Sequence, residues 1–216
     1  MFDTIIRFFQ EGGTFMFPIA IVLAIGLAIA IERALYLFKT SKANGSAMNA
    51  ITPLLKQADF DSITKIDSDS AIANIFKAGV TRMSQSPRRD EIESAMEEGV
   101  MEALPHLEKR TAYLATLANI STLLGLLGTI IGLIAAFSAV ASADPAEKAS
   151  LLSDSISVAM NTTAFGLIVA IPLLLCHSVL QTKTTEIVDN LEMAGIKFLN
   201  LLSRDDAIST KSRTTD

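Results

Sequence analysis

Three long runs without a charged residue constrain this chain more than any other feature of its sequence. They cover residues 15–31, 113–143 and 156–180. A helix rises ~1.5 Å per residue, so each run can cross the hydrocarbon core of a bilayer, the first with help from neighbouring interfacial aromatic residues. Ala, Ile, Leu and Val supply most of the apolar mass and Trp is absent, which suits closely packed helices. The predicted fold class is an all-α membrane protein with three transmembrane helices.

The first run could also be the hydrophobic part of a secretory signal peptide. Residues 28–30, Ala-Ile-Ala, resemble a cleavage site. Signal peptides begin with a positively charged segment, whereas the residues before this run include Asp3 and Glu11 and only Arg7 as a basic side chain. The sequence therefore favours a retained membrane anchor.

The distribution of Lys and Arg orients the predicted spans. Basic residues are concentrated between the first and second runs and after the third, whereas the opposite side holds only Arg7 and Lys148. Basic residues near span ends favour the cytoplasmic side, so the large loop and the C-terminal tail are expected there. The expected organisation is an outer segment at 1–14, spans at 15–31, 113–143 and 156–180, a cytoplasmic loop at 32–112, an outer loop at 144–155, a cytoplasmic helical tail at 181–208 and a disordered end at 209–216.

Both cytoplasmic segments carry apolar residues at helical spacing, which is typical of a helical-bundle core. The stripes are Met48, Ile51, Leu54, Leu55 and Ala58; Ile72, Ile75, Phe76, Gly79, Val80 and Met83; Ile92, Ala95, Met96, Gly99, Val100, Ala103 and Leu107; and, in the tail, Ile187, Leu191, Ala194, Phe198 and Leu201. The third of these helices is predicted to continue into the second span. The helix of the third span is predicted to extend into the cytoplasm and pack there.

Composition and motifs exclude several classes of function. The net charge is -5, and the basic pairs at 88–89 and 109–110 are short and lack interleaved aromatic residues, so no nucleic-acid binding is expected. Cys176 is the single cysteine, and His106 and His177 have no ligand partners in sequence, so no disulfide framework or metal site is predicted. The sequence has no Gly-rich phosphate loop and no nucleophile–base set. We therefore expect no enzyme and no cofactor.

The second run carries small and hydroxylated residues on a connected helical face. Gly128 and Gly132 are one turn apart, and Thr122, Gly125 and Thr129 join them at offsets of three and four. Such a face lets another helix approach closely. By itself the pattern indicates tight helix packing.

The third run contains three consecutive polar side chains, Asn161, Thr162 and Thr163, followed by Gly166. Unsatisfied polar groups are costly at this depth. At ~100° per residue the three cannot point the same way, so at least one is expected to face a neighbouring helix and another could face a pore. For each threonine, a hydrogen bond to its own helix is the alternative.

Neither of these two runs contains Asp or Glu. If protons cross the membrane here, the carboxylate that carries them must come from a partner or lie near the outer end of a span. Asp154 is the local candidate. Because it follows Ser153, it could instead cap the start of the third span.

Two segments taken together resemble a known family. Residues 123–132 (LLGLLGTIIG) followed by residues 162–172 (TTAFGLIVAIP) closely resemble the two signature segments of the MotA/TolQ/ExbB proton-channel family. Glu32-Arg33 after the first span, the large cytoplasmic loop and the topology are similar as well. The resemblance therefore covers nearly the whole chain.

This resemblance implies an assembly and a partner. Family members form a pentameric ring in the bacterial inner membrane, with the N-terminus in the periplasm. The ring surrounds a dimer of a single-span partner resembling ExbD, TolR or MotB, whose membrane Asp carries the proton. On this resemblance Thr129 and Thr163 match the family's two pore-facing threonines, with Thr162, Asn161 and Thr122 as neighbours. A TonB-like protein and membrane lipid are further expected partners.

The sequence departs from the family pattern at two places. Val158 stands where ExbB proteins place a Glu, and Ser121-Thr122 replaces an Ala-Pro pair. The resemblance favours an ExbB/TolQ-like subunit that couples proton motive force to mechanical work in TonB-dependent transport or a similar process. The alternatives are a subunit of a gliding or flagellar-stator-type motor and a passive scaffold without conduction.

Overall fold

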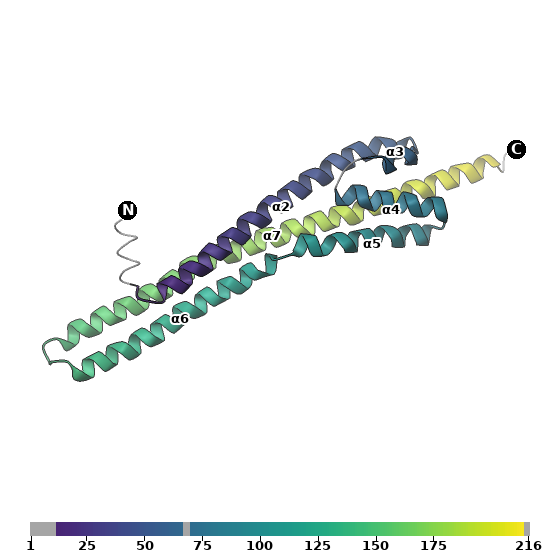
Figure 1. The fold of residues 1–216 in the computed structure, drawn as a ribbon. Helices are drawn as coiled ribbons and strands as arrows, with labels where there is room; N and C mark the ends of the chain where they lie inside the picture. Colours follow the sequence, from purple (N-terminus) through teal and green to yellow (C-terminus); the bar gives the residue numbers. More distant parts are fainter. Residues whose placement is uncertain (1–11, 67–69, 214–216) are drawn as a thin grey trace. The chain divides into compact units, whose positions relative to one another are not determined.

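Helices make up the regular structure throughout the described residues. The computed structural model describes residues 12–66 and 70–213, with side chains described as far as residue 202. The charges before the first span, most of the predicted segment 1–14 and the last three residues lie outside these ranges. The all-α prediction is confirmed. The helices are α2 (Met16–Lys56), α3 (Phe60–Thr64), α4 (Ala71–Gln85), α5 (Arg89–Glu108), α6 (Thr111–Ser142) and α7 (Lys148–Arg213) (Figure 1).

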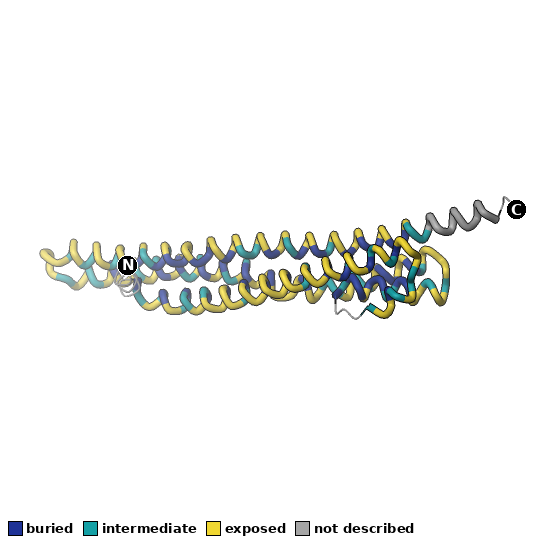
Figure 2. Tube along the Cα trace, turned by 90° about the horizontal axis from the view of Figure 1, so that it is seen from above, coloured by how far each residue is buried: buried dark blue, intermediate teal, exposed yellow. Residues whose placement is uncertain are grey.

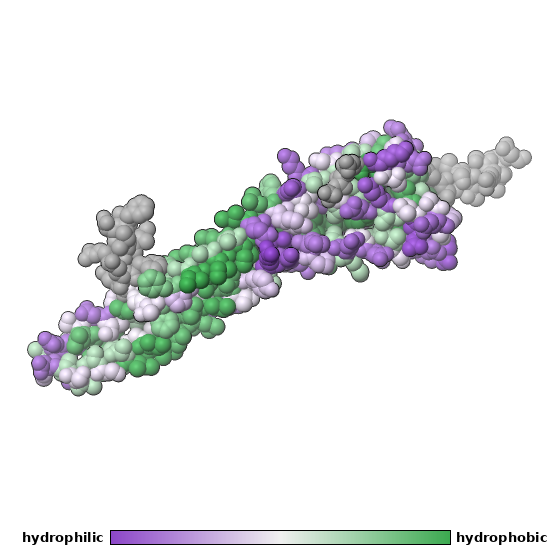
Figure 3. Space-filling model, viewed as in Figure 1, coloured by the Kyte–Doolittle hydropathy of each residue, from purple (hydrophilic) through white to green (hydrophobic). Residues whose placement is uncertain are grey.

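The chain divides into two compact units. The apolar unit comprises residues 1–33 and 110–179, and the charged unit comprises residues 34–109 and 180–216. Helices α2 and α7 contribute to both. Hydrophobic residues dominate the surface of the apolar unit, and hydrophilic residues are frequent on the charged unit (Figure 3).

Within the described ranges, three helices are long and apolar enough to cross a membrane, which agrees with the three predicted spans. Many large apolar side chains of these helices are exposed, for example Leu123, Ile130 and Ile134 on α6. The exposed surface follows the outside of each helix, and the buried residues lie where helices face one another (Figure 2). Since exposed apolar surface suits lipid or further membrane helices, the chain is a multi-pass membrane protein.

Helix α2 is longer than the span it contains. It runs without interruption from Met16 to Lys56 and includes Pro53, although the first predicted span ends at residue 31. The part beyond the span belongs to the charged unit, where Ala47, Ile51 and Leu55 are buried. Packing therefore carries the helix through Pro53, which on its own disfavours a helix interior.

The predicted continuation of α5 into the second span is wrong. Helix α5 ends at Glu108 and α6 begins at Thr111. Between them Arg110 takes the left-handed conformation, with φ of 63°. The left-handed conformation is unfavourable for residues other than glycine and cannot continue a right-handed helix. The chain therefore forms two separate helices here.

The connection between α6 and α7 comprises residues 143–147, and α7 begins at Lys148. Its first turns include Asp154, which is exposed. Because the helix starts six positions earlier, the alternative that Asp154 caps it is wrong. At the other end α7 reaches Arg213, so it enters the segment for which the composition predicts disorder.

The charged unit has the core that the helical stripes predict. Residues from all four stripes are buried, namely Ile51, Leu55, Ile72, Ile75, Phe76, Val80, Ile92, Ala95, Met96, Leu107, Ile187, Leu191, Ala194 and Phe198. The Phe198 ring packs edge-on against Phe76, with ring centroids 5.5 Å apart, and against Phe60 at 6.0 Å. The predicted extension of the third span as a packed helix is thereby confirmed.

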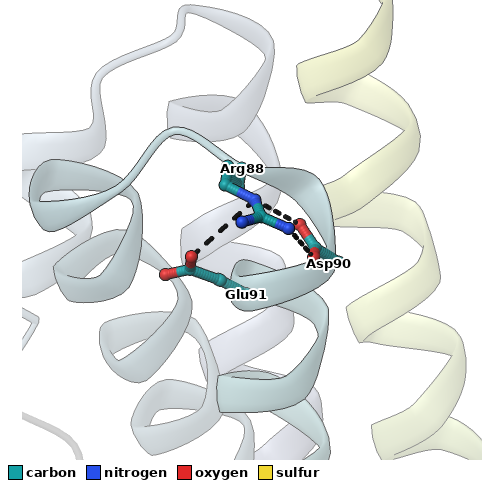
Figure 4. A network of polar contacts seen from close by, with 3 residues as sticks. All are labelled: Arg88, Asp90 and Glu91. Atoms are coloured by element: carbon teal, nitrogen blue, oxygen red, sulfur yellow. Dashed lines mark hydrogen bonds and ion pairs between the residues drawn. The ribbon is translucent and has the colours of Figure 1, made fainter.

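Charged residues mark the start of α5, as Figure 4 shows. The Arg88 guanidinium donates from Nη2 to Oδ2 of Asp90 at 2.6 Å and lies 3.8 Å from Glu91. The hydrogen bond from Arg88 lowers the pKa of Asp90 below its usual range. Asp90 and Glu91 also lie in the first turn of α5, where the helix dipole favours negative charge. The Arg88 and Asp90 side chains are largely exposed, so the ion pair between them contributes little to stability.

Replacing Phe198 with Ala is expected to destabilise the charged unit by ~3–5 kcal/mol, because a fully buried aromatic ring is removed and a cavity remains. The thermal unfolding midpoint of the purified protein in detergent, followed by circular dichroism, measures the loss. Phe198→Leu, which fills most of the space, should lose less. Equal midpoints for Phe198→Ala and the wild type would contradict the assignment of Phe198 to the core.

Candidate hydroxyl-lined site between two membrane helices

Two glycines bring α6 and α7 together backbone to backbone. A Cβ atom on Gly166 would lie 2.8 Å from the carbonyl oxygen of Ser121 and 3.2 Å from Cα of Gly125. A Cβ on Gly125 would lie 3.2 Å from Cα of Thr163. Since carbon atoms at optimal contact are ~3.5–4.0 Å apart, a side chain at either position would push the helices apart. This close approach sets the positions of the hydroxyl groups around it.

Ser121 lies beside this contact and is fully buried. Its Oγ donates a hydrogen bond to the carbonyl oxygen of Gly166 at 3.0 Å. Sequence reasoning treated Ser121 only as a departure from the family pattern. Its position one turn before Gly125, on the same helical face, is the signal that could have identified it as a contact residue.

Thr162 is turned into the protein. It is only 2% exposed, and its Oγ1 lies 2.7 Å from the carbonyl oxygen of Gly12 and 2.9 Å from that of Val158. The Thr162 side chain also occupies the space in front of Gly128. Thr162 therefore joins α7 both to α6 and to the residues that precede α2.

Thr129 and Thr163 form a pair that is only half-buried. Their Oγ1 atoms are 3.5 Å apart. Thr163 donates across the helix contact to the carbonyl oxygen of Gly125 at 2.9 Å, and Thr129 donates within its own helix to the carbonyl oxygen of Leu126 at 2.6 Å. A hydroxyl has one proton and two lone pairs, so each Oγ1 can still accept a hydrogen bond while its proton is in use.

The other predicted residues of the two spans make separate contacts. The Thr122 hydroxyl donates to the carbonyl oxygen of Ala118 in its own helix at 3.2 Å. Asn161 is half-buried. Gly132 faces Ala159, whose Cβ would lie 2.9 Å from a Cβ on the glycine. The close contact between α6 and α7 thus extends from Ser121 to Gly132.

Two of the residues predicted to lie at a membrane boundary, Glu32 and Arg33, lie at one end of the apolar unit. Glu32 pairs with Arg110, with Oε2 and Nη1 3.4 Å apart and both side chains about half exposed. Arg33 is only 2% exposed, so its charge faces protein rather than lipid. In the described part of the chain, no group of three or more His, Cys, Asp or Glu side chains could hold a metal ion.

Replacing Ser121 with Ala is expected to lower stability by ~0.5–1.5 kcal/mol, because the hydrogen bond to Gly166 is lost while the smaller side chain fits without strain. The thermal midpoint in detergent measures this loss. Ser142→Ala is the matched control, since that hydroxyl reaches only carbonyl oxygens of its own helix. A loss no larger than that of the control would show that the Ser121 bond contributes nothing.

The fold and this site define a class of protein: a multi-pass helical membrane protein with two glycine-packed, hydroxyl-bearing spans and a separate charged unit. The model of the MotA/TolQ/ExbB proton channel family matches residues 67–193, which is more than half of the chain. The chain belongs to this family, as the sequence resemblance predicts.

Two curated relatives agree with this assignment. A putative biopolymer transport protein ExbB homolog from Methanothermobacter thermautotrophicus is 29% identical over 201 residues, which cover 89% of this chain and 68% of the relative. The putative biopolymer transport protein ExbB-like 3 from Synechocystis sp. is 30% identical over 176 residues, covering 80% and 83%. At this level of identity the chain is a divergent member.

Proposed function

We propose that this chain is the ring-forming subunit of an ion-driven motor of the ExbB/TolQ type. In this proposal five copies surround a dimer of a single-span partner resembling ExbD or TolR, whose membrane Asp carries protons. The N-terminus and the loop between α6 and α7 face the periplasm, and the charged unit lies in the cytoplasm. The Thr129–Thr163 pair supports this proposal most directly, because it places two accessible hydroxyls on spans that contain no carboxylate.

The pair has the chemistry that a transient proton carrier needs beside it. A protonated carboxylic acid donates one hydrogen bond, and a carboxylate accepts several. Each Oγ1 can accept from the protonated acid or from water, and each can donate once it releases its carbonyl partner. Ionised carboxylates are costly within a bilayer, so hydroxyls along the partner's path would lower the barrier to proton release.

The remaining residues of the site take supporting roles in this proposal. Thr122, two turns before Thr129 on the same face of α6, extends the polar path along that helix, and Asn161 adds a polar group one residue before Thr162. Thr162 joins α7 to the residues before α2, since its hydroxyl donates to the carbonyl oxygen of Gly12, and its side chain packs against Gly128 of α6. Asp154 lies on the outer side, where protons enter, and the Glu32–Arg110 pair marks the inner end.

The driving force is sufficient for mechanical work. One elementary charge that crosses the membrane releases ~2.3 kcal/mol per 100 mV. A few charges per step can therefore shift a conformational equilibrium of several kcal/mol. The names of both relatives refer to biopolymer transport, so we propose energised transport, through a TonB-like protein, as the output of the motor.

Proton flux into proteoliposomes under an imposed potential tests the proposal. The samples contain this chain alone, the chain with a co-expressed single-span partner, and the chain with a partner whose membrane Asp is changed to Asn. We expect flux only when this chain and the intact partner are both present. Equal flux with the Asp→Asn partner would show that this Asp does not carry the protons. No flux with the intact partner would contradict a channel and favour a scaffold.

A further inference from the structure

The charged unit carries two grooves whose charges are opposite. The acidic groove has a volume of about 410 Å³ and lies between α5 and α7. Its rim carries Glu93, Glu97 and Glu192, and its floor is apolar. Among the described residues that line it there is no Lys or Arg. Met101 and Ile196 stand at its edge, 71% and 58% exposed.

The basic groove lies between α2 and α7 and also measures about 410 Å³. Lys56 and Lys197 are its charged residues, and Met48, Leu55 and Leu201 supply an apolar floor. No Asp or Glu occurs among the described residues that line it. Each groove therefore offers apolar surface framed by one sign of charge. The two charges are opposite, so the two surfaces are electrostatically complementary.

Helix α7 separates the two grooves. Lys197 follows Glu192 by five positions, which turns their side chains ~140° apart around the helix axis. Two surfaces that point to different sides of one molecule cannot both be used in a two-fold symmetric contact. They suit a head-to-tail contact, in which every copy uses one surface for each of two neighbours.

The two grooves also lie at nearly the same level of α7. Five residues correspond to ~7.5 Å along the helix axis, a small part of a helix of 66 residues. Extended Lys and Glu side chains can bridge that distance. A neighbour can therefore be related by a rotation about an axis parallel to α7 with little shift along it. Such an operation closes a ring, whereas a large shift would produce an open filament.

We propose that the acidic groove of one copy receives the basic groove of the next copy, so that the charged units form a closed belt of head-to-tail contacts. The occupant is thus a second copy of this chain. The proposal rests on the ring of the proposed function and adds the surfaces through which neighbouring charged units meet. Exposed Met101 and Ile196 become buried in these contacts, which removes their apolar surface from water.

Zero-length crosslinking with a carbodiimide tests this contact, because the reagent joins a carboxylate to an ammonium only when the two groups touch. The oligomer is purified from a mixture of unlabelled and ¹⁵N-labelled chains, so that peptides joined between copies are recognised by mass spectrometry. We expect mixed-label crosslinks from Glu97 or Glu192 to Lys56 or Lys197. Glu97→Gln with Glu192→Gln should abolish them, and the matched pair Glu98→Gln with Asp189→Asn should not.

Charge reversal provides an independent measurement that a folding defect cannot imitate. Glu97→Lys with Glu192→Lys should reduce the recovered oligomer, and adding Lys56→Glu with Lys197→Glu should restore it. An intact oligomer without these crosslinks, or crosslinks from the acidic groove to another protein, would overturn the proposal while leaving the proposed function standing. A monomeric protein would overturn both.

Discussion

Alanine at position 166 is expected to separate α6 from α7 and to destabilise the apolar unit by ~1–3 kcal/mol or more. The added Cβ would meet the Ser121 carbonyl oxygen at 2.8 Å and Gly125 Cα at 3.2 Å. Both are backbone atoms of a long helix, so no side-chain rotation relieves the contact. Any displacement also lengthens the Thr163–Gly125 hydrogen bond, which is 2.9 Å in the native arrangement. Thermal unfolding in detergent and the yield of intact oligomer measure the effect.

Gly45→Ala is the matched control for this experiment. Gly45 is also a helical glycine, but no atom lies within 4 Å of the position that a Cβ would take. Alanine favours a helix over glycine by ~0.5–1 kcal/mol, so this variant should be as stable as the wild type or slightly more stable. If Gly166→Ala matched Gly45→Ala, the backbone contact between α6 and α7 would not limit the fold.

The spans could be predicted because their physical requirement is simple. A bilayer demands uncharged apolar helices of sufficient length, and residues 15–31, 113–143 and 156–180 meet that demand. The buried stripes of the charged unit were predictable for a related reason, since apolar residues at helical spacing must pack on one another. Both signals are local in the sequence.

The length of α2 was not predictable in this way. Asn44, Gly45 and Pro53 all have low helix propensity, and together they favour an end to the helix. In the structure Asn44 is buried and accepts a hydrogen bond from the backbone N–H of Ile72, near the start of α4, at 3.4 Å. A contact between residues 28 positions apart thus helps to hold the segment in place, and propensity alone does not report such contacts.

Which hydroxyl groups are buried in helix contacts and which stay accessible was also not predictable, because it depends on contacts between helices. Periodicity places Ser121, Thr122 and Thr129 on related faces of α6 but does not say which of them a neighbouring backbone occupies. The distance between the two helices determines the burial of each hydroxyl. Ser121 lies at the glycine contact and is fully buried, whereas Thr129 lies farther along α6 and is half-buried. Thr162 and Thr163 differ similarly, because adjacent residues on a helix point ~100° apart.

Under the proposed function, replacing Thr163 with Val is expected to slow proton flux strongly while the oligomer remains intact. Valine has nearly the shape of threonine, so the packing against Gly125 persists, but the bond to the Gly125 carbonyl oxygen and the contact with Thr129 at 3.5 Å are both lost. Removing a polar group from a low-dielectric path costs ~1–3 kcal/mol, which slows flux by roughly 5- to 160-fold. Proton flux in proteoliposomes with the partner measures the loss.

Two variants separate the hydroxyl from the shape of the side chain. Thr163→Ser keeps the hydroxyl and should retain most of the flux. Thr116→Val makes the same chemical change on α6 at a threonine that bonds only weakly to its own helix, 3.4 Å from the Ala112 carbonyl oxygen, and should leave flux unchanged. Full flux in Thr163→Val would remove this hydroxyl from the ion path. If Thr163→Val, Thr163→Ser and Thr116→Val were equally impaired, the defect would lie in assembly. Only a loss of flux confined to Thr163→Val reports the chemistry of the Thr129–Thr163 pair.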